Sequence, residues 1–489
     1  MNNKSFSLED ASISSIHNAI IKSEICFKEL IQMYIKRIEK YDKIGPKLNS
    51  IITINPHALE IAEKLDKIFQ ETGELKDLHG IPVLLKDNIN TKDMPTTAGS
   101  IALESVFPSD DAFITKRLKE AGAIIIAKVN LHEFAVWGET SSSILGQTLN
   151  PYDLIRTPGG SSGGTSAAIA ANFGIIGIGT DTINSVRSPA SACNLIGLRP
   201  TIGLVSRSGI VPYALTQDTA GPIMRTVEDT ARVLDTIVGY DATDSITMDS
   251  IGNIPNSYTE YLNKDGLNGK RIGILRSFFG TEEIHKEVNH IVLNSLNTAE
   301  KSGAILIDIE ENLDTDELVQ NVSVHLYELK AHLNLYLSQL GSETNVHSLE
   351  DIIRSGKYHS GIEENIKYAQ TLDTNTEDYY NRLNKRYNLQ KHIVKIMDKY
   401  DLDIIAYPHQ KRPVVKIGEV QVDRNGVLGS VTGFPSIVIP AGFTKATDTA
   451  SMGVPVGMEL LGRKWSEPTL IEIAYALEQA GHSHKPPIL

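Results

Sequence analysis

The chain has 489 residues, of which 41% are hydrophobic and 22% are charged, and its formal net charge is −13. This length predicts two or three domains, or one large α/β domain. The acidic balance, without any basic stripe, argues against DNA or RNA as a direct partner.

The first thirty residues lack a basic stretch followed by an apolar one, so no signal peptide is expected. No apolar run approaches the roughly 20 residues that span a bilayer. We therefore expect a cytoplasmic protein with no membrane partner. Apolar residues recur every three or four positions over 8–42 and again over 57–72, which predicts two helices, and Gly73 is expected to end the second.

From residue 80 the pattern changes to short runs rich in Val and Ile, each typical of a strand buried on both faces. These runs are GIPVLLK (80–86), AIIIAKV (123–129), IIGIG (175–179) and RIGIL (271–275). Helix-like segments alternate with them at 110–121, 164–173 and 226–238. Such alternation predicts an α/β sheet covered by helices.

The second half of the chain has a different pattern of polar and apolar residues. Residues 282–400 are polar, tyrosine-rich and mostly helical in pattern, and DIIAYP, FPSIVIPAGF and PVGMELLG then return to strand texture. The simplest assembly is one α/β body with a helical insertion. Its parts are N-terminal helices (1–72), a catalytic α/β core (80–280), a helical insertion or roof (282–400), and final strands with a C-terminal helix (401–489).

Residues 156–171, RTPGGSSGGTSAAIAA, form a glycine- and serine-rich loop before a helix. A phosphate-binding P-loop needs a lysine where Thr165 stands, and a dinucleotide fingerprint needs a third glycine where Thr182 stands. The remaining role is to shape the backbone around a hydroxyl at Ser161 or Ser162. From the loop alone, a plain Gly/Ser turn fits equally well.

A second cluster lies at 177–200, where Ser185 follows an apolar strand between Asp181 and Arg187. A buried ion pair would fix this turn, although two such charges alone more often form a solvated pair. Lys86 ends the apolar run GIPVLLK. Burial would lower its pKa and allow a neutral amine to act as a base, whereas an isolated lysine more often extends its ammonium group to solvent.

These elements, in this order, resemble the amidase signature family over most of the chain. GIPVLLKDN is similar to the family's lysine motif, GGSSGG to its glycine–serine core, and GIGTDTINSVRSP to its nucleophile turn. GLVSRSGIVPYALTQDTAGP, and GFPSIVIPAGF followed by GVPVGMELLGR, are also similar to the family, and the former is most similar to the branch that contains bacterial peptide amidases.

The resemblance implies a single large domain with a central twisted mixed sheet and a Ser–cis-Ser–Lys triad. Ser161 and Ser185 are 24 positions apart, which is the spacing of the family's two serines. The resemblance therefore implies Ser185 as nucleophile, Ser161 as relay and Lys86 as base. By the same resemblance, the backbone N–H groups of Thr182, Ile183, Asn184 and Ser185 form the oxyanion hole, and Gly160, Ser162, Asp181 and Arg187 support the site.

One departure from the family pattern concerns Ile183-Asn184, where members commonly have two small residues, often Gly-Gly. The difference makes the substrate pocket less predictable, and it weakens the match to the amidase component of glutamine-dependent tRNA amidotransferases. The leading hypothesis is a free-standing amide hydrolase acting on a small-molecule or short-peptide amide. The alternatives are an amidotransferase subunit that passes ammonia to a partner and a non-catalytic ligand-binding protein.

No cofactor or metal is expected, because His57, His79 and His132 are scattered without ligand spacing. Two distant cysteines make neither a disulfide framework nor a zinc site, and Cys193 is expected to be a small buried hydrophobe. The sequence does not decide whether the protein is a homodimer, because an apolar helix face can pack internally or against a second copy of the chain. The tyrosines of 282–400 either line the cleft or decorate helix surfaces.

Overall fold

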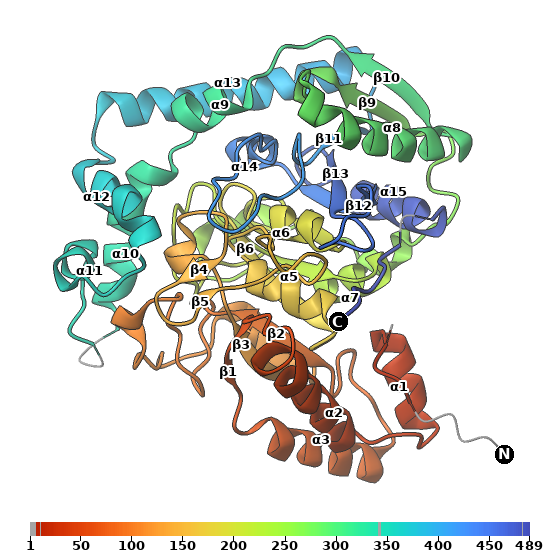
Figure 1. Ribbon diagram of the computed structural model, residues 1–489, viewed down its shortest axis with the longest axis vertical. Helices are drawn as coiled ribbons and strands as arrows, with labels where there is room; N and C mark the ends of the chain where they lie inside the picture. Colours follow the sequence, from red (N-terminus) through yellow and green to blue (C-terminus); the bar gives the residue numbers. More distant parts are fainter. Residues whose placement is uncertain (1–5, 10, 341–343, 482) are drawn as a thin grey trace.

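The computed structural model describes residues 6–9, 11–340, 344–481 and 483–489. Over these residues the chain folds around one sheet of 11 strands, which helices flank (Figure 1). The strand order is β1-β3-β2-β6-β8-β7-β12-β13-β11-β9-β10. Pairing is parallel at β3-β2-β6 and at β11-β9-β10 and antiparallel elsewhere, so the predicted mixed α/β sheet is confirmed.

The strands have short spans, and β4 and β5 form a separate hairpin. Their bounds are β1 Ile51–Ile54, β2 Pro82–Lys86, β3 Ile124–Val129, β4 Ser141–Ser142, β5 Gly146–Gln147, β6 Ile176–Asp181, β7 Ile196–Arg199, β8 Thr219–Met224, β9 Arg271–Leu275, β10 Ile305–Ile309, β11 Ile404–Pro408, β12 Ser436–Phe443 and β13 Pro455–Leu461.

The α-helices account for most of the remaining regular structure. Their bounds are α1 Ile13–Ile21, α2 Phe27–Ile38, α3 Ala58–Thr72, α4 Phe113–Glu120, α5 Gly163–Ala170, α6 Arg187–Ala192, α7 Val227–Ile237, α8 Lys286–Lys301, α9 Thr315–Glu317, α10 His325–Ser338, α11 Leu349–Ser355, α12 Glu363–Thr371, α13 Glu377–Lys399, α14 Val427–Thr432 and α15 Glu467–Gln479.

The Val- and Ile-rich runs all form strands, because β2, β3, β6 and β9 coincide with them. Strands β2, β3 and β6 are buried along their whole length, as expected for strands covered on both faces. The pattern missed β1, β7, β8 and β10. Strand β10 lies at the sheet edge, inside the segment predicted to be mostly helical; it carries a short apolar run, Ile305 to Ile307, but only Ile309 of the strand is buried.

The helical pattern predicted over residues 8–42 is confirmed, but it is interrupted, because the chain forms two α-helices and a π-helical turn there. Ser23 has a φ of +55°, which ends α1 in the left-handed region. Cys26 then caps α2, and the Glu29 carboxylate accepts a hydrogen bond from the Cys26 N–H. The helix predicted over 57–72 is confirmed as α3, and Gly73, with φ +69°, ends it.

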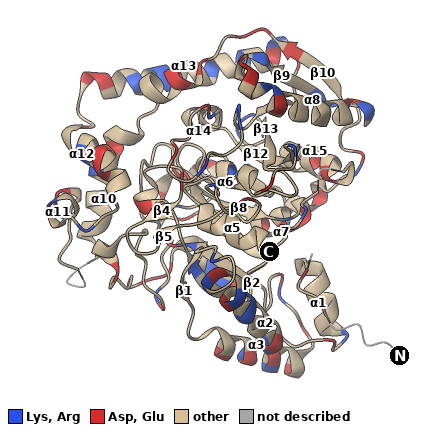
Figure 2. Cartoon of the chain, in the orientation of Figure 1, with Lys and Arg blue, Asp and Glu red and all other residues tan. Residues whose placement is uncertain are grey.

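Helix α5 lies at the centre of the molecule and packs against β2, β6 and β8 (Figure 1). It is built from Gly, Ala, Ser, Thr and one Ile, and every one of its residues is buried. Small side chains let its backbone approach the sheet closely. Helix α5 carries no charged residue, whereas α2, α3 and α13 carry many acidic and basic residues (Figure 2).

Helices α10 to α13 lie along one side of the molecule, on the left and top in Figure 1. Helix α12 packs against α10 and α11, and α13 packs against α14. Leu329, Leu333, Leu349, Ile352 and Ile366 form a separate apolar cluster with residues of the 98–136 region. Among the described residues, no helix combines the length and the hydropathy that crossing a membrane requires.

Candidate active site

Lys86 is the last residue of β2 and is completely buried. Its Nζ lies 2.7 Å from Ser161 Oγ and 2.8 Å from Thr180 Oγ1. Burial lowers the pKa of Lys86 from its ordinary value near 10.5 to about 7, and the negative charges of Asp181 and Asp218 only partly oppose this. A substantial fraction of the amine is therefore neutral at pH 7, and the side chain does not extend to solvent.

Ser161 lies in the glycine-rich loop before α5 and is fully buried. The Gly160–Ser161 peptide bond is cis. The Ser161 carbonyl accepts a hydrogen bond from the His132 N–H at 3.0 Å. Lys86 thus contacts Ser161 and not its neighbour Ser162.

Ser162 has a different place in the loop. Its N–H donates to the Ser185 carbonyl at 3.2 Å, and its Oγ accepts from the Thr180 N–H at 3.3 Å. Of the loop glycines, Gly159 has a positive φ of +72°, whereas a Cβ at Gly164 would lie 2.2 Å from the Asn130 carbonyl oxygen. The loop is therefore close-packed rather than a plain surface turn.

Ser185 lies in the turn between β6 and α6, and it is 6% exposed. It opens onto a cavity of about 310 Å³. Thr182, Ile183 and Asn184 line the same cavity. The four residues predicted to form an oxyanion hole therefore share one wall of a single cavity.

A buried ionic network holds the turn between β6 and α6. Asp181 accepts hydrogen bonds from Arg187 Nη2 at 3.1 Å, from Arg199 Nη1 at 2.7 Å and from the Val186 N–H at 3.0 Å. Burial alone would raise the pKa of Asp181, but the two guanidinium groups hold it well below its ordinary value. The Asp181–Arg187 pair is thus buried and charged.

The network continues to Glu459 on β13. Glu459 bonds to Arg187 Nη1, accepts from Tyr407 Oη at 3.0 Å, and lies 2.7 Å from His409 Nδ1. Burial opposes ionisation, yet Arg187 and His409 lower the pKa of Glu459 to about 2. This network connects β13 to the turn between β6 and α6. Sequence reasoning did not single out Glu459, because 272 positions separate it from Arg187.

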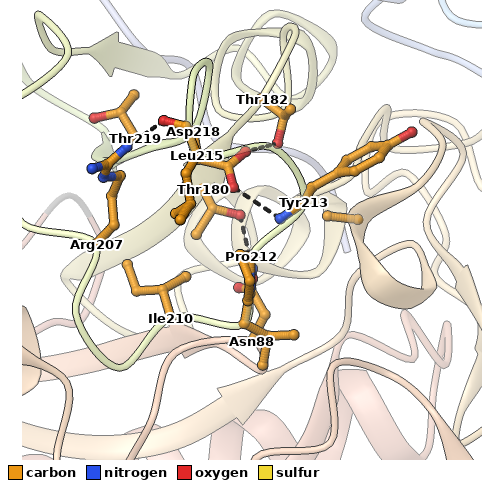
Figure 3. Close-up of a pocket in the computed structure, with 12 residues that line it drawn as sticks. Asn88, Thr180, Thr182, Arg207, Ile210, Pro212, Tyr213, Leu215, Asp218 and Thr219 are labelled. Carbon is orange, nitrogen blue, oxygen red and sulfur yellow. Dashed lines mark hydrogen bonds between the residues drawn. The ribbon is translucent and has the colours of Figure 1, made fainter. Parts of the chain in front are cut away.

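A second group of hydrogen-bonded residues contacts the turn between β6 and α6 and lines a small cavity of about 10 Å³ (Figure 3). The Asp218 carboxylate accepts hydrogen bonds from Thr182 Oγ1 at 2.6 Å and from the Tyr213 N–H at 2.8 Å. Asn88 Nδ2 donates to Thr180 Oγ1 at 3.1 Å. Burial raises the pKa of Asp218. Asn88, Thr180 and Asp218 were not predicted as site residues, although each falls inside one of the family-like motifs.

The wall opposite the turn is mainly apolar at its mouth, where Trp137, Val420 and Val422 are 41%, 63% and 47% exposed. Arg424 lies over the Trp137 ring and is paired with Glu139 at 3.0 Å. Residues of the 282–400 region that line the cavity are Asp316, Val319, Gln320 and His325. Tyr368, Tyr380 and Tyr387 are about half exposed, so several tyrosines of this region do decorate helix surfaces.

The three histidines considered in the sequence, His57, His79 and His132, do not form a cluster. His79 and His132 are buried, and His57 is exposed just before α3, beside Glu60. Within the described part of the chain, no group of three or more His, Cys, Asp or Glu side chains is arranged to hold a metal ion. Cys193 is fully buried, as predicted.

The Amidase family model matches residues 29–471. The chain belongs to the amidase family. It is 35% identical to a probable amidase of Arabidopsis thaliana over 99% of this chain and 92% of that protein. It is 34% identical to a glutamyl-tRNA(Gln) amidotransferase protein of Methanosarcina mazei, one component of that enzyme, over 94% of this chain and 95% of that protein.

Among solved structures, this amidase is similar to the native peptide amidase of Stenotrophomonas maltophilia. The TM-score is 0.87 and the identity 34%, with 98% of each chain covered. The comparisons and the fold agree that this amidase is a hydrolase that acts on amide C–N bonds.

Proposed function

We propose that this amidase hydrolyses a carboxamide through an acyl-enzyme on Ser185, with Ser161 as relay and Lys86 as base. The observation that carries the proposal is the 2.7 Å contact between a buried lysine Nζ and Ser161 Oγ, in a loop bonded directly to the Ser185 backbone. A neutral amine in this position can accept a proton, which an exposed ammonium cannot.

In the first half-reaction, Lys86 accepts the Ser161 proton while Ser161 accepts the Ser185 proton. Ser185 Oγ bonds to the substrate carbonyl carbon, and the carbonyl electron pair moves to oxygen. Backbone N–H groups of the 182–185 turn stabilise this oxyanion, and losing one such donor typically costs about 3 kcal/mol. When the C–N bond breaks, the relay returns the proton to the departing nitrogen, which leaves as ammonia or an amine.

In the second half-reaction, water gives a proton to the same relay, and its oxygen attacks the acyl carbon. Release of the carboxylic acid restores the Ser185 hydroxyl. Two easier steps thus replace direct hydrolysis of an unreactive amide. No part of this scheme requires a cofactor.

We propose an uncharged amide with an apolar or peptide-like acyl part as the substrate. The apolar mouth formed by Trp137, Val420 and Val422 supports this choice. So does the similarity to a peptide amidase over almost the whole chain. The cytoplasmic location and the homodimer stay predictions from the sequence.

The test is intact-mass measurement after treatment with a serine-directed phosphonate. We expect one adduct, which peptide mapping places on Ser185 and which Ser185→Ala abolishes. Ser188→Ala is the matched control, because Ser188 lies one turn away and its Oγ accepts a hydrogen bond from Gln410. An adduct elsewhere, or none in an active preparation, would contradict the assignment.

A second candidate function is that of an amidotransferase component, which the similarity to the Methanosarcina mazei protein favours. It predicts glutaminase activity and a partner that copurifies with the chain. A homogeneous 53.6 kDa chain that hydrolyses simple amides and not glutamine would exclude it. A non-catalytic ligand-binding protein would give no covalent adduct at all.

A further inference from the structure

Asn184, the residue before Ser185, has a polar side chain that is not hydrogen-bonded to any described residue. Asn184 is 4% exposed and lines the 310 Å³ cavity. Its carbonyl oxygen accepts the Ser188 N–H at 2.7 Å, which fixes its backbone. Among the described residues, its carboxamide has no hydrogen-bond partner, and its amide atoms are open to the cavity rather than sealed in the core.

The position of this side chain is restricted by its neighbours. A Cβ added at Gly426 would lie 2.7 Å from Asn184 Cβ and 2.5 Å from His409 Cε1. His409 is itself held by Glu459. The Asn184 Cβ is therefore packed closely against Gly426, and the residue lines the cavity.

Of the charged residues that line the cavity, Arg424 and Asp423 are paired with other protein side chains, whereas Asp316 is exposed. Arg424 pairs with Glu139 at 3.0 Å, and Asp423 pairs with Arg412 at 3.3 Å. Burial lowers the pKa of His325 to about 4, so its ring is neutral at pH 7. A carboxamide that faces a cavity without a protein partner is free to exchange hydrogen bonds with a ligand.

We propose that Asn184 is a specificity-determining residue whose carboxamide pairs with a second, uncharged amide group of the substrate. A carboxamide offers one N–H donor face and one carbonyl acceptor, which together complement a peptide group. When the leaving group is ammonia, any second amide must lie on the acyl side of the scissile bond. The chain then prefers acylated amino-acid amides over simple carboxamides, an inference that rests on the proposed hydrolysis at Ser185.

The experiment compares kcat/KM for two uncharged substrates with the same aromatic group. N-acetyl-phenylalaninamide carries the second amide, and 3-phenylpropanamide lacks it. We expect Asn184→Ala to lower the ratio of kcat/KM for the first substrate to kcat/KM for the second by about tenfold or more, because a site built to hydrogen-bond a group loses most with substrates that carry it.

Asn253→Ala is the matched control, because Asn253 lies on the surface and its side chain bonds only to the Asp249 carbonyl. It should leave the ratio of the two kcat/KM values unchanged, and thermal melting verifies that each variant is folded. Equal losses for both substrates, or no loss for either, would overturn the role of Asn184. A wild-type chain that hydrolyses neither substrate, or activity that survives in Ser185→Ala, would overturn the proposed function and this inference with it.

Discussion

At the scale of single residues, the chemistry that we propose for this amidase requires that the Lys86 amine be kept out of water. Lys86 has no exposed surface, and its nearest hydrogen-bond partners are two hydroxyl groups and a more distant carbonyl rather than a carboxylate. A carboxylate in direct contact would hold the proton on the amine and raise the pKa. Lys128, in β3, is equally buried and burial lowers its pKa too, but there the Asp87 carboxylate lies 3.0 Å away and opposes the shift directly.

The first prediction concerns the pH dependence of this lysine. Since the pKa of Lys86 is lowered to about 7, the neutral fraction increases as pH rises through that value. We expect kcat/KM for a neutral amide to increase with pH on its acid side, with an apparent pKa near 7, and then to level off. Lys86→Ala should reduce kcat by roughly 10²–10⁴ while leaving the melting transition cooperative. Near-normal turnover in that variant would remove the lysine from the mechanism.

At the scale of secondary-structure elements, two carboxylates each accept a hydrogen bond from the first N–H group of another helix. In this way they join α1, α7 and α15, which are distant in sequence. Asp229 of α7 accepts the N–H of Ile13, the first residue of α1, at 3.3 Å. Glu478 of α15 accepts the N–H of Val227, the first residue of α7, at 2.9 Å. Because these carboxylates are also buried, burial raises the pKa of Asp229 to about 6 and that of Glu478 to about 7.

The second prediction follows from the raised pKa of Glu478. The unfolded chain releases this proton near the ordinary value of 4.5, whereas the folded chain keeps it up to about 7, so stability falls as pH rises between these values. Glu478→Gln keeps an acceptor for Val227 without the charge. We expect the variant to gain stability over the wild type as pH rises from 4.5 to 7, by at most about 3 kcal/mol.

Urea unfolding at pH 4.5 and pH 8 measures this difference. Glu364→Gln, at an exposed position on α12, is the control and should change stability by a similar small amount at both pH values. A Glu478→Gln effect that is the same at both pH values would contradict the assigned burial of the carboxyl group.

At the scale of the whole molecule, helices α10 and α13 contact the loop before β8, and that loop in turn contacts the turn between β6 and α6. Glu328 of α10 is fully buried and accepts the Thr216 N–H at 3.0 Å and the Tyr379 hydroxyl of α13 at 2.7 Å. Thr216 lies two residues before Asp218, which bonds to Thr182. Glu328 thus joins α10 and α13 to the loop that contacts the turn between β6 and α6, and we expect substrate binding to depend on this contact.

The third prediction tests that coupling. Glu328→Ala leaves the Thr216 N–H and the Tyr379 hydroxyl without this partner, so we expect a loss of roughly 2–4 kcal/mol in the free energy of unfolding and an increased KM. Tyr379→Phe removes one hydrogen bond and should cost about 1 kcal/mol. Tyr380→Phe is its matched control, because Tyr380 is 53% exposed, and it should change stability by less than about 0.5 kcal/mol. Equal effects of the two tyrosine variants would argue against a structural role for Glu328.

Local sequence determined those parts of the fold that depend on a run of neighbouring residues. Apolar runs such as PVLLK and IIIAKV form strands because burying them removes a continuous apolar surface from water. Gly73 ends α3 because it adopts the left-handed conformation at little cost. The motifs around Lys86 and Ser161 likewise marked two residues that the structure brings into contact.

Only the tertiary structure decided which distant segments meet. The break at Ser23 lacks a local signal strong enough to predict it, and the short apolar run of β10 does not reveal that the strand pairs at the sheet edge. Glu459 joins the Arg187 network, and Asn184 faces an open cavity, because strands and turns far apart in sequence pack side by side. Burial, and with it the lowered pKa of Lys86, is a property of the whole packed body, since water is excluded by residues contributed from many elements.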